Sequence, residues 1–263
     1  MTGGVIVVSM EHKPLVTFEN VSKRFGKNQV LKNLNLNIAP HKITFIIGRS
    51  GEGKSVTLKH IIGSLIPDSG TVTVFGENYV TSEKTNICKL RKRIGYLFQH
   101  GALFDSMTAL DNVVFPLLDS YPKETKKNFA KAQLLLESLN VAHTAKHFPS
   151  ELSVGEKKLV GLARAIALEP ELLLYDEPTT SMDSFVSHLI DDTILDMQKK
   201  NPQLTTIVVS HDIQSVLNVA DFIVFLHQGH VYLEGDKETF LRSQDEIVVQ
   251  FLSGALEGPL KKT

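Results

Sequence analysis

The chain lacks the features of a secreted or membrane-spanning protein. A single cysteine, Cys88, occurs among its 263 residues, which excludes an internal disulfide framework and favours a reducing compartment. No stretch reaches the roughly 18 apolar residues that suggest a membrane-spanning helix. The segment Met1–Met10 lacks the basic start and the long apolar core of a secretion signal. We therefore expect a cytoplasmic protein without a membrane span of its own.

An excess of charge of either sign is also lacking. The chain carries 28 basic and 29 acidic residues, a formal net charge of −1, and no long block of lysine and arginine. This balance argues against a general attraction to nucleic acid and against a polybasic membrane anchor. Hydrophobic residues make up 42% of the sequence, which is ample for a buried core. Any role at a membrane must therefore come through a partner.

Short apolar strands that alternate with helical segments are the main pattern present. Continuous apolar, largely β-branched runs occupy Ile43–Ile47, Leu172–Tyr175 and Thr206–Ser210, and such runs suit strands buried on both faces of a parallel sheet. Leu15–Ile38 alternates apolar and polar residues around a turn at Phe25–Asn28, which predicts an antiparallel hairpin. The pattern predicts an α/β fold with a mixed, mostly parallel core sheet and an antiparallel β subdomain.

A largely helical insert is predicted between these strands. Lys123–Leu139 carries apolar residues at helical spacing, with lysine and glutamate on the other face. The helix Gly155–Leu168 must end before Pro170, because proline cannot continue the hydrogen-bond ladder. We expect a helical subdomain over about 101–168. Two further helices and a terminal hairpin are predicted at Ser187–Lys199, Lys237–Arg242 and 222–234.

A glycine-rich loop, Gly48–Ser55 (GRSGEGKS), fits the phosphate-binding pattern G-x-x-x-x-G-K-[ST] between a predicted strand and a predicted helix. Glycines let the backbone approach phosphates closely, and the helix turns its positive dipole end toward them. Lys54 is expected on the β- and γ-phosphates of ATP, and Ser55 on Mg²⁺. A chance glycine-rich turn is the alternative, which this setting disfavours. The predicted nucleotide-binding residues of the loop are Gly48, Arg49, Ser50, Gly51, Glu52, Gly53, Lys54, Ser55 and Val56.

Polar side chains follow three other predicted strands. Asp176 and Glu177 end an apolar strand, where open α/β sheets bind their ligands. We expect Asp176 to hold Mg²⁺ and Glu177 to act as the general base for the attacking water. His211 follows a neighbouring strand and could reach the γ-phosphate, and Gln99 closes another strand in the same manner. Each of these residues alone could be structural, and their order along the chain favours a catalytic site.

The order of these motifs resembles that of nucleotide-binding subunits of ATP-binding cassette (ABC) transporters, over about Leu15–Leu241. The distinguishing element is Leu152–Glu156 (LSVGE), which is similar to the LSGGQ-type signature of that family. Ser153 and Gly155, the γ-phosphate contacts in the family, are retained. The resemblance implies a P-loop ATPase of ABC type.

The resemblance also implies domain boundaries. The sequence departs from the family pattern at two positions of the signature. A single ATPase domain is expected over 15–242, with an N-terminal segment 1–14 and a C-terminal extension 243–263. The tail 254–263 is either disordered, the commoner outcome, or a strap onto a second subunit. In the signature, Val154 replaces a glycine and Glu156 a glutamine, which leaves open a weak site or pairing with a different subunit.

Similarity to the family implies a head-to-tail dimer, expected to be a homodimer. Ser153 and Gly155 of one subunit would close over the ATP that Lys54 of the other subunit holds. Phe25 would stack on adenine, and Gln99 would sense Mg²⁺ and the transmembrane partner. The dimer-communication loop would contain Asp183, although its sequence TSMD fits the usual SALD only loosely. The remaining catalytic roles fall to the P-loop lysine, the general base and the histidine named above.

A narrower resemblance links the chain to the Mla-type ATPases that serve Mce-domain phospholipid transporters. It is carried by Gly48–Ile62, including Arg49, and by Phe98–Leu117, which contains GALFDSMT. It implies a permease that contacts the region Gln99–Phe115 and a Mce-domain lipid-binding partner. Four apolar residues form either the socket for this permease or part of the helical core: Leu103, Phe104, Met107 and Phe115.

We therefore predict an ATP- and Mg²⁺-dependent ATPase that drives phospholipid movement across the bacterial envelope. It would lie on the inner face of the cytoplasmic membrane through its permease. The main alternative is the ATPase of an importer for a small solute such as an amino acid or a metal. A non-transport ABC protein acting on nucleic acid is disfavoured by the charge balance, and a P-loop kinase is disfavoured by the LSVGE segment.

Overall fold

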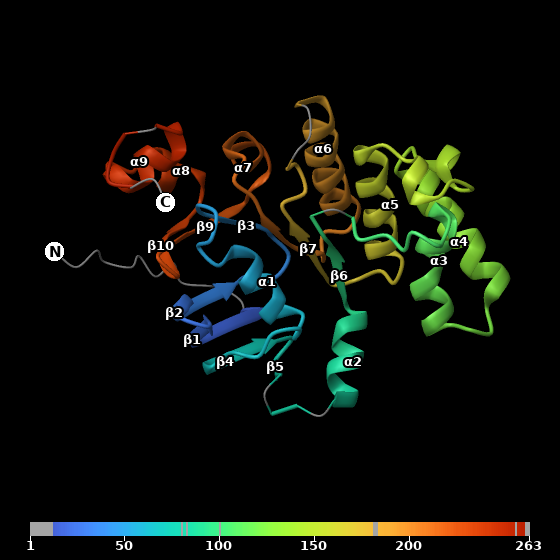
Figure 1. Cartoon of the computed structure of the whole chain (residues 1–263), viewed down its shortest axis with the longest axis horizontal. Helices are drawn as coiled ribbons and strands as arrows, with labels where there is room; N and C mark the ends of the chain where they lie inside the picture. The colour runs from blue at the N-terminus through green and yellow to red at the C-terminus, as the bar shows by residue number, and fades with distance from the viewer. Residues whose placement is uncertain are drawn as a thin grey trace. The chain divides into compact units, whose positions relative to one another are not determined.

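The computed structural model describes residues 13–79, 81–82, 84–99, 101–180, 184–255 and 257–260. They belong to two compact units, which are described separately. The first unit is drawn from 1–80 and 210–263, and the second from 81–209. In Figure 1 the second unit runs from green to orange along the colour scale. Most of the predicted N-terminal segment 1–14 and the loop residue Asp183 lie outside the described residues.

The first unit contains two sheets. Its elements are β1 (Val16–Phe25), β2 (Asn28–Ile38), β3 (Ile43–Ile47), α1 (Lys54–Ile61), β4 (Ser69–Val74), β5 (Glu77–Asn78), α7 (Ile213–Val219), β9 (Phe222–His227), β10 (His230–Gly235), α8 (Lys237–Leu241) and α9 (Glu246–Ser253). One sheet has the order β2-β1-β4-β5 and is antiparallel throughout. In the other, β9 pairs in parallel with β3 and antiparallel with β10. The predicted antiparallel subdomain and both predicted hairpins are confirmed.

The second unit contains a parallel sheet and a group of helices. Its elements are α2 (Lys84–Lys92), β6 (Ile94–Leu97), α3 (Ala109–Ser120), α4 (Thr125–Ser138), two short 3₁₀ turns η1 (Ala142–Thr144) and η2 (Pro149–Glu151), α5 (Val154–Ile166), β7 (Leu172–Asp176), α6 (Ser184–Lys200) and β8 (Thr205–Val209). The strands lie in the order β8-β7-β6 and are parallel. Helices α3, α4 and α5 pack on one another (Figure 1), which confirms the predicted helical insert.

The continuous apolar runs of the sequence became fully buried strands. Every residue of β3, β7 and β8 is buried, which is the burial that such runs predict. Five elements were not predicted: β4, β5, α2, α7 and α9. The predicted α/β fold with a mixed sheet is confirmed. In the described part of the chain, no helix has the length and apolar character needed to cross a membrane.

Disorder, the commoner outcome expected for the tail 254–263, is wrong for its described residues. The Gln250 side chain on α9 accepts a hydrogen bond from Leu260 N at 2.7 Å. Its amide donates to Ala255 O at 3.2 Å and to Leu260 O at 3.4 Å. Leu260 is buried. A buried amide with these three bonds holds the described part of the tail against α9, because leaving the amide unsatisfied would cost free energy.

Candidate active site

The glycine-rich loop between β3 and α1 requires glycine for two separate reasons. Gly48, Gly51 and Gly53 have φ values of 151°, 84° and 97°, a region that residues with a Cβ rarely adopt. A Cβ on Gly48 would lie 2.5 Å from Leu226 O, whereas a Cβ on Gly51 would meet nothing within 4 Å. Gly48 is therefore required by conformation and by packing, and Gly51 by conformation alone.

The start of α1 suits an anion such as the triphosphate of ATP. Gly53 is the N-cap residue and gives no side-chain cap, and the first turn contains no acidic residue. The first backbone N–H groups of a helix have no partners within the helix, so they bind anions readily. Lys54 is only 5% exposed, and its Nζ donates to Gly48 O at 2.9 Å and Arg49 O at 3.1 Å. The ammonium group is therefore held against the loop that would receive the phosphates.

One carboxylate within this loop turns toward a partner that the sequence did not indicate. Glu52 Oε1 lies 3.2 Å from Nδ1 of His227, at the end of β9, and both side chains are mostly buried. The backbone N–H of Glu52 donates to Arg49 O at 3.3 Å. Since 175 residues separate Glu52 from His227, no local sequence pattern could have revealed this pair.

The acidic pair lies at the carboxyl end of β7. Asp176 is buried, and its Oδ2 accepts a hydrogen bond of 2.9 Å from Tyr96 OH. Burial and the neighbouring Asp176 raise the pKa of Tyr96, which keeps it a donor. Glu177 has a positive φ of 49°, its N–H donates to Val209 O at 2.9 Å, and its Oε2 accepts from Thr180 Oγ1 at 2.8 Å. Such strained backbone is common at functional sites.

A buried lysine supports the loop that carries this pair. Lys158 on α5 donates from Nζ to Glu177 O and Thr180 O, both at 3.3 Å, and also to Pro178 O. Burial lowers the pKa of Lys158 to about 8. This lysine was not among the residues predicted for the site. Its signal was a lysine on an otherwise apolar helix face, close after the signature segment.

The signature segment forms the start of α5. Ser153 is the N-cap residue: its Oγ accepts from Glu156 N at 3.2 Å, while its own N–H donates to Glu156 Oε2 at 2.8 Å. Glu156 Oε1 lies 2.8 Å from Nε2 of His143. The hydrogen bonds from Ser153 and then His143 lower the pKa of Glu156 to about 2. The glutamate in place of glutamine therefore completes a capping box. Ser153 and Val154 are exposed, and a Cβ on Gly155 would lie 3.2 Å from Val186 Cγ1.

The other predicted site residues lie in different units. Gln99 is half-buried in the turn after β6, in the second unit, whereas His211 is exposed just before α7, in the first. Asp212 caps α7 and donates its N–H to Ser210 Oγ at 3.0 Å. In the first unit, Phe25 at the end of β1 is 46% exposed. The described residues contain no group of three or more His, Cys, Asp or Glu arranged to hold a metal.

The oxygen donors that were predicted for Mg²⁺ fit that ion. Asp176 and Gln99 in the second unit offer a carboxylate and an amide oxygen, and Ser55 in the first unit offers a hydroxyl. Mg²⁺ prefers such oxygen ligands.

An exposed aromatic pair lies in the region predicted to meet a permease. Phe104 and Phe115 are each 44% exposed, and their ring centroids lie 5.0 Å apart. The Arg164 guanidinium lies 5.7 Å from the Phe104 centroid and donates to Gly101 O and Ala102 O, both at 2.9 Å. Leu103 and Met107 are half-buried. These four apolar residues were predicted to form either a socket for the permease or part of the helical core. For the two phenylalanines, surface exposure favours the socket.

The profile of the ABC transporter family matches residues 31–180. The chain belongs to the ABC transporter family. It is 38% identical over 249 residues to the intermembrane phospholipid transport system ATP-binding protein MlaF of Haemophilus influenzae, covering 94% of this chain and 93% of that protein. It is 32% identical over 247 residues to the probable ribonucleotide transport ATP-binding protein mkl of Mycobacterium leprae, covering 93% and 70% of the two chains.

A solved ABC cassette shares the fold. It is the dimeric structure of a cassette in a post-hydrolysis state bound to ADP and Pi, with a TM-score of 0.77 and 31% identity, covering 84% of this chain and 98% of that one. The predicted ABC fold and ATPase class are confirmed, and ATP is the nucleotide of this family. The individual residue roles stay predictions.

Proposed function

We propose that this chain is the ATPase of a transporter that moves phospholipid between membranes. The observation that supports the cargo most strongly is the 38% identity, over nearly the full length of both chains, to a protein named for intermembrane phospholipid transport. The ATPase would lie at the inner face of the cytoplasmic membrane, bound there by a permease. Its charge balance argues against a nucleic-acid partner.

The first unit would bind the nucleotide. The loop Gly48–Val56 and the start of α1 would hold the phosphates, with Lys54 on the β- and γ-phosphates. Phe25 would stack on adenine, and its exposed ring is suited to that contact. His211 would hydrogen-bond the γ-phosphate.

The second unit would supply the hydrolytic groups. Glu177 would take a proton from the attacking water, and its bond from Thr180 fixes the carboxylate for that task. Asp176 and Gln99, with Ser55 of the first unit, would hold Mg²⁺, which when bound neutralises the charge that develops on the phosphates. Lys158 would keep the backbone of the acidic pair in place.

The active form would be a homodimer. Ser153 and Gly155 of one subunit would close over the ATP of the other. The dimeric structure of a related cassette bound to ADP and Pi supports the proposal of a dimer. ATP would favour the closed dimer and hydrolysis would release it, which biases two states of the permease. Phe104 and Phe115 would form the apolar socket for the permease, and a Mce-domain protein would carry the lipid.

A small solute is the competing cargo. The relative named for ribonucleotide transport is 32% identical to this chain, so an importer ATPase is the second candidate. The two candidates differ in their partners and in the molecule that copurifies with them.

Mass spectrometry of the affinity-purified complex from detergent-solubilised membranes separates the candidates. A multispanning permease with a Mce-domain protein and bound phospholipid would support lipid transport. A permease with a solute-binding protein would indicate that the cargo is a small solute. Failure to recover any permease would contradict both transporter candidates. The matched control is the double variant Phe104→Asp, Phe115→Asp, which should lose the permease while the chain stays folded.

A further inference from the structure

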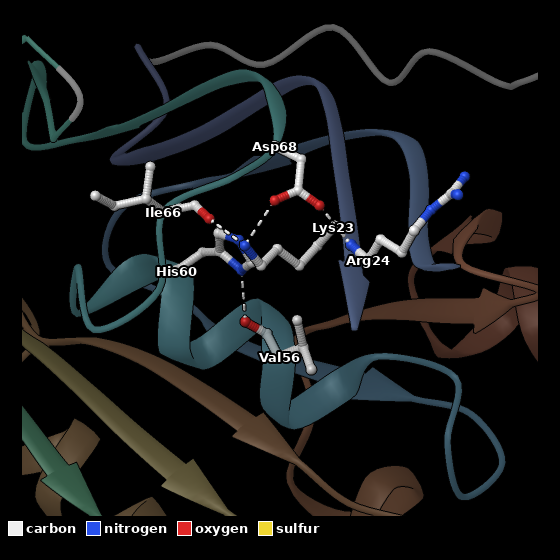
Figure 2. Close-up of polar contacts among 6 residues, drawn as sticks. All are labelled: Lys23, Arg24, Val56, His60, Ile66 and Asp68. Atoms are coloured by element: carbon white, nitrogen blue, oxygen red, sulfur yellow. Dashed lines mark hydrogen bonds and ion pairs between the residues drawn. The ribbon is translucent and has the colours of Figure 1, made fainter. Parts of the chain in front are cut away.

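Asp68 holds the last residues of β1 in place. The pairing of β1 with β4 ends at Ser22 and Ser69. Beyond this point the Asp68 carboxylate, instead of a strand, accepts hydrogen bonds from β1. Its Oδ2 accepts from Arg24 N at 2.7 Å, and its Oδ1 accepts from Lys23 Nζ at 2.8 Å. Figure 2 shows the carboxylate bridging these two residues. A single side chain therefore fixes both the backbone and a side chain of the strand end that leads to Phe25.

Lys23 connects this carboxylate to the Phe25 ring. Its Nζ also donates to Ile66 O at 2.8 Å and lies 5.8 Å from the ring centroid of Phe25, within the range of a cation–π interaction. The Lys23 side chain is only 16% exposed, whereas Phe25 is 46% exposed. The hydrogen bonds from Lys23 and then from the Arg24 N–H lower the pKa of Asp68, so this carboxylate stays ionised near neutral pH. The Lys23 ammonium group thus lies over one face of the exposed Phe25 ring.

His60 on α1, the helix that follows the glycine-rich loop, interacts electrostatically with Lys23 and Asp68. His60 on α1 is buried, and its Nδ1 lies 2.8 Å from Val56 O (Figure 2). Because a carbonyl only accepts, Nδ1 carries the proton. Burial lowers the pKa of His60, so the imidazole is neutral and does not add a second cation near Lys23. The loop that follows α1 leads directly to Asp68, which bonds the end of β1 beside Phe25.

We infer that Asp68 and Lys23 are positioning residues for the nucleotide base: they hold Phe25 in the orientation that stacks on adenine. This inference rests on the proposed function, in which Phe25 is the stacking residue. A ring that is already ordered loses less conformational entropy on binding than a mobile one. Since Lys23 lies over one face, the base would stack on the other.

The test compares the dissociation constants of two probes, ATP and tripolyphosphate, which lacks a base, for the full chain by titration calorimetry. Asp68→Asn and Lys23→Met should each weaken ATP binding roughly two- to fivefold, the range of an exposed cation–π contact. Tripolyphosphate binding should not change. Lys23→Arg keeps the charge and should retain ATP affinity, and the double variant should be no worse than either single one.

The controls separate this inference from the proposed function. Asp236→Asn removes another carboxylate that holds a backbone N–H in the same unit, that of Thr239, and should leave both constants unchanged. Equal weakening of ATP and tripolyphosphate would show general damage to the phosphate site and would overturn the inference, as would unchanged ATP binding. Phe25→Ala is expected to weaken ATP binding and to leave tripolyphosphate binding unchanged. The wild-type chain is expected to hydrolyse ATP. If Phe25→Ala binds ATP normally, the inference fails while the ATPase assignment stands.

Discussion

The glycine-rich loop 48–55 and the signature segment 152–156 both lead into a helix, but they are held in different ways. The first is set by backbone geometry, since three glycines adopt positive φ and Gly48 packs against the Leu226 carbonyl. The second is set by side chains, through the reciprocal hydrogen bonds of Ser153 and Glu156. A loop fixed by its backbone tolerates few substitutions, whereas a capped helix start accepts changes that keep its hydrogen bonds.

The largest effect on stability is expected from Gly48→Ala. The new Cβ would lie 2.5 Å from Leu226 O, and the unusual φ adds strain, so the free energy of unfolding should fall by about 3 kcal/mol. Gly51→Ala is the matched control: it has positive φ but open space, and should cost only about 1 kcal/mol. Urea denaturation measures both. Equal losses would contradict the role of the Leu226 contact.

Lys54→Ala should weaken the binding of ATP by about 1.5–3 kcal/mol, roughly ten- to a hundredfold, because a charged hydrogen-bond donor to phosphate is removed. The chain should remain folded, and calorimetry measures the dissociation constant. An unchanged constant would show that the phosphates bind elsewhere.

In the signature segment, Glu156→Gln should cost about 0.5–1 kcal/mol of stability near neutral pH, since a capping carboxylate near a helix start is lost. The sign follows from the depressed pKa. Stabilisation by Glu156 is fully present above its ordinary pKa of 4.5 and is lost as the pH falls through about 2. Urea denaturation from pH 7 to pH 3 should therefore show the two curves converging, and a pH-independent gap would contradict the argument.

The smallest effect is expected from Val154→Gly, which restores the family residue. Val154 is 55% exposed in the first turn of α5, so the free energy of unfolding should change by less than about 1 kcal/mol. If the ATPase rate is also unchanged, the signature of this chain is not weakened by valine. A rise in rate would show that it is.

The strands and the glycine-rich loop could be predicted because their determinants are local. Continuous apolar runs predicted β3 and β7, and the loop pattern predicted the start of α1 within one residue. Two of the elements that were not predicted are polar or short: α2 carries lysines and an arginine in its last turn, and α7 spans seven residues.

The supporting contacts of the site could not be predicted, because they join residues far apart in the chain. Lys158 reaches the backbone of Glu177 and Pro178, and Asp68 meets Lys23 across 45 residues. The tail was also misjudged, since the Gln250 amide that holds Leu260 has no distinctive local pattern. Sequence patterns identified the groups proposed to touch ATP, and the structure identified the groups that hold them.

The most direct test of the ATPase account is phosphate release by Glu177→Gln compared with the wild type, in the purified complex with saturating MgATP. The account predicts a loss of turnover of about a hundred- to ten-thousandfold, the usual contribution of a general base, with ATP binding retained and a stable dimer trapped. Turnover near the wild-type rate would contradict the assignment of Glu177 and, with it, the proposed catalytic site.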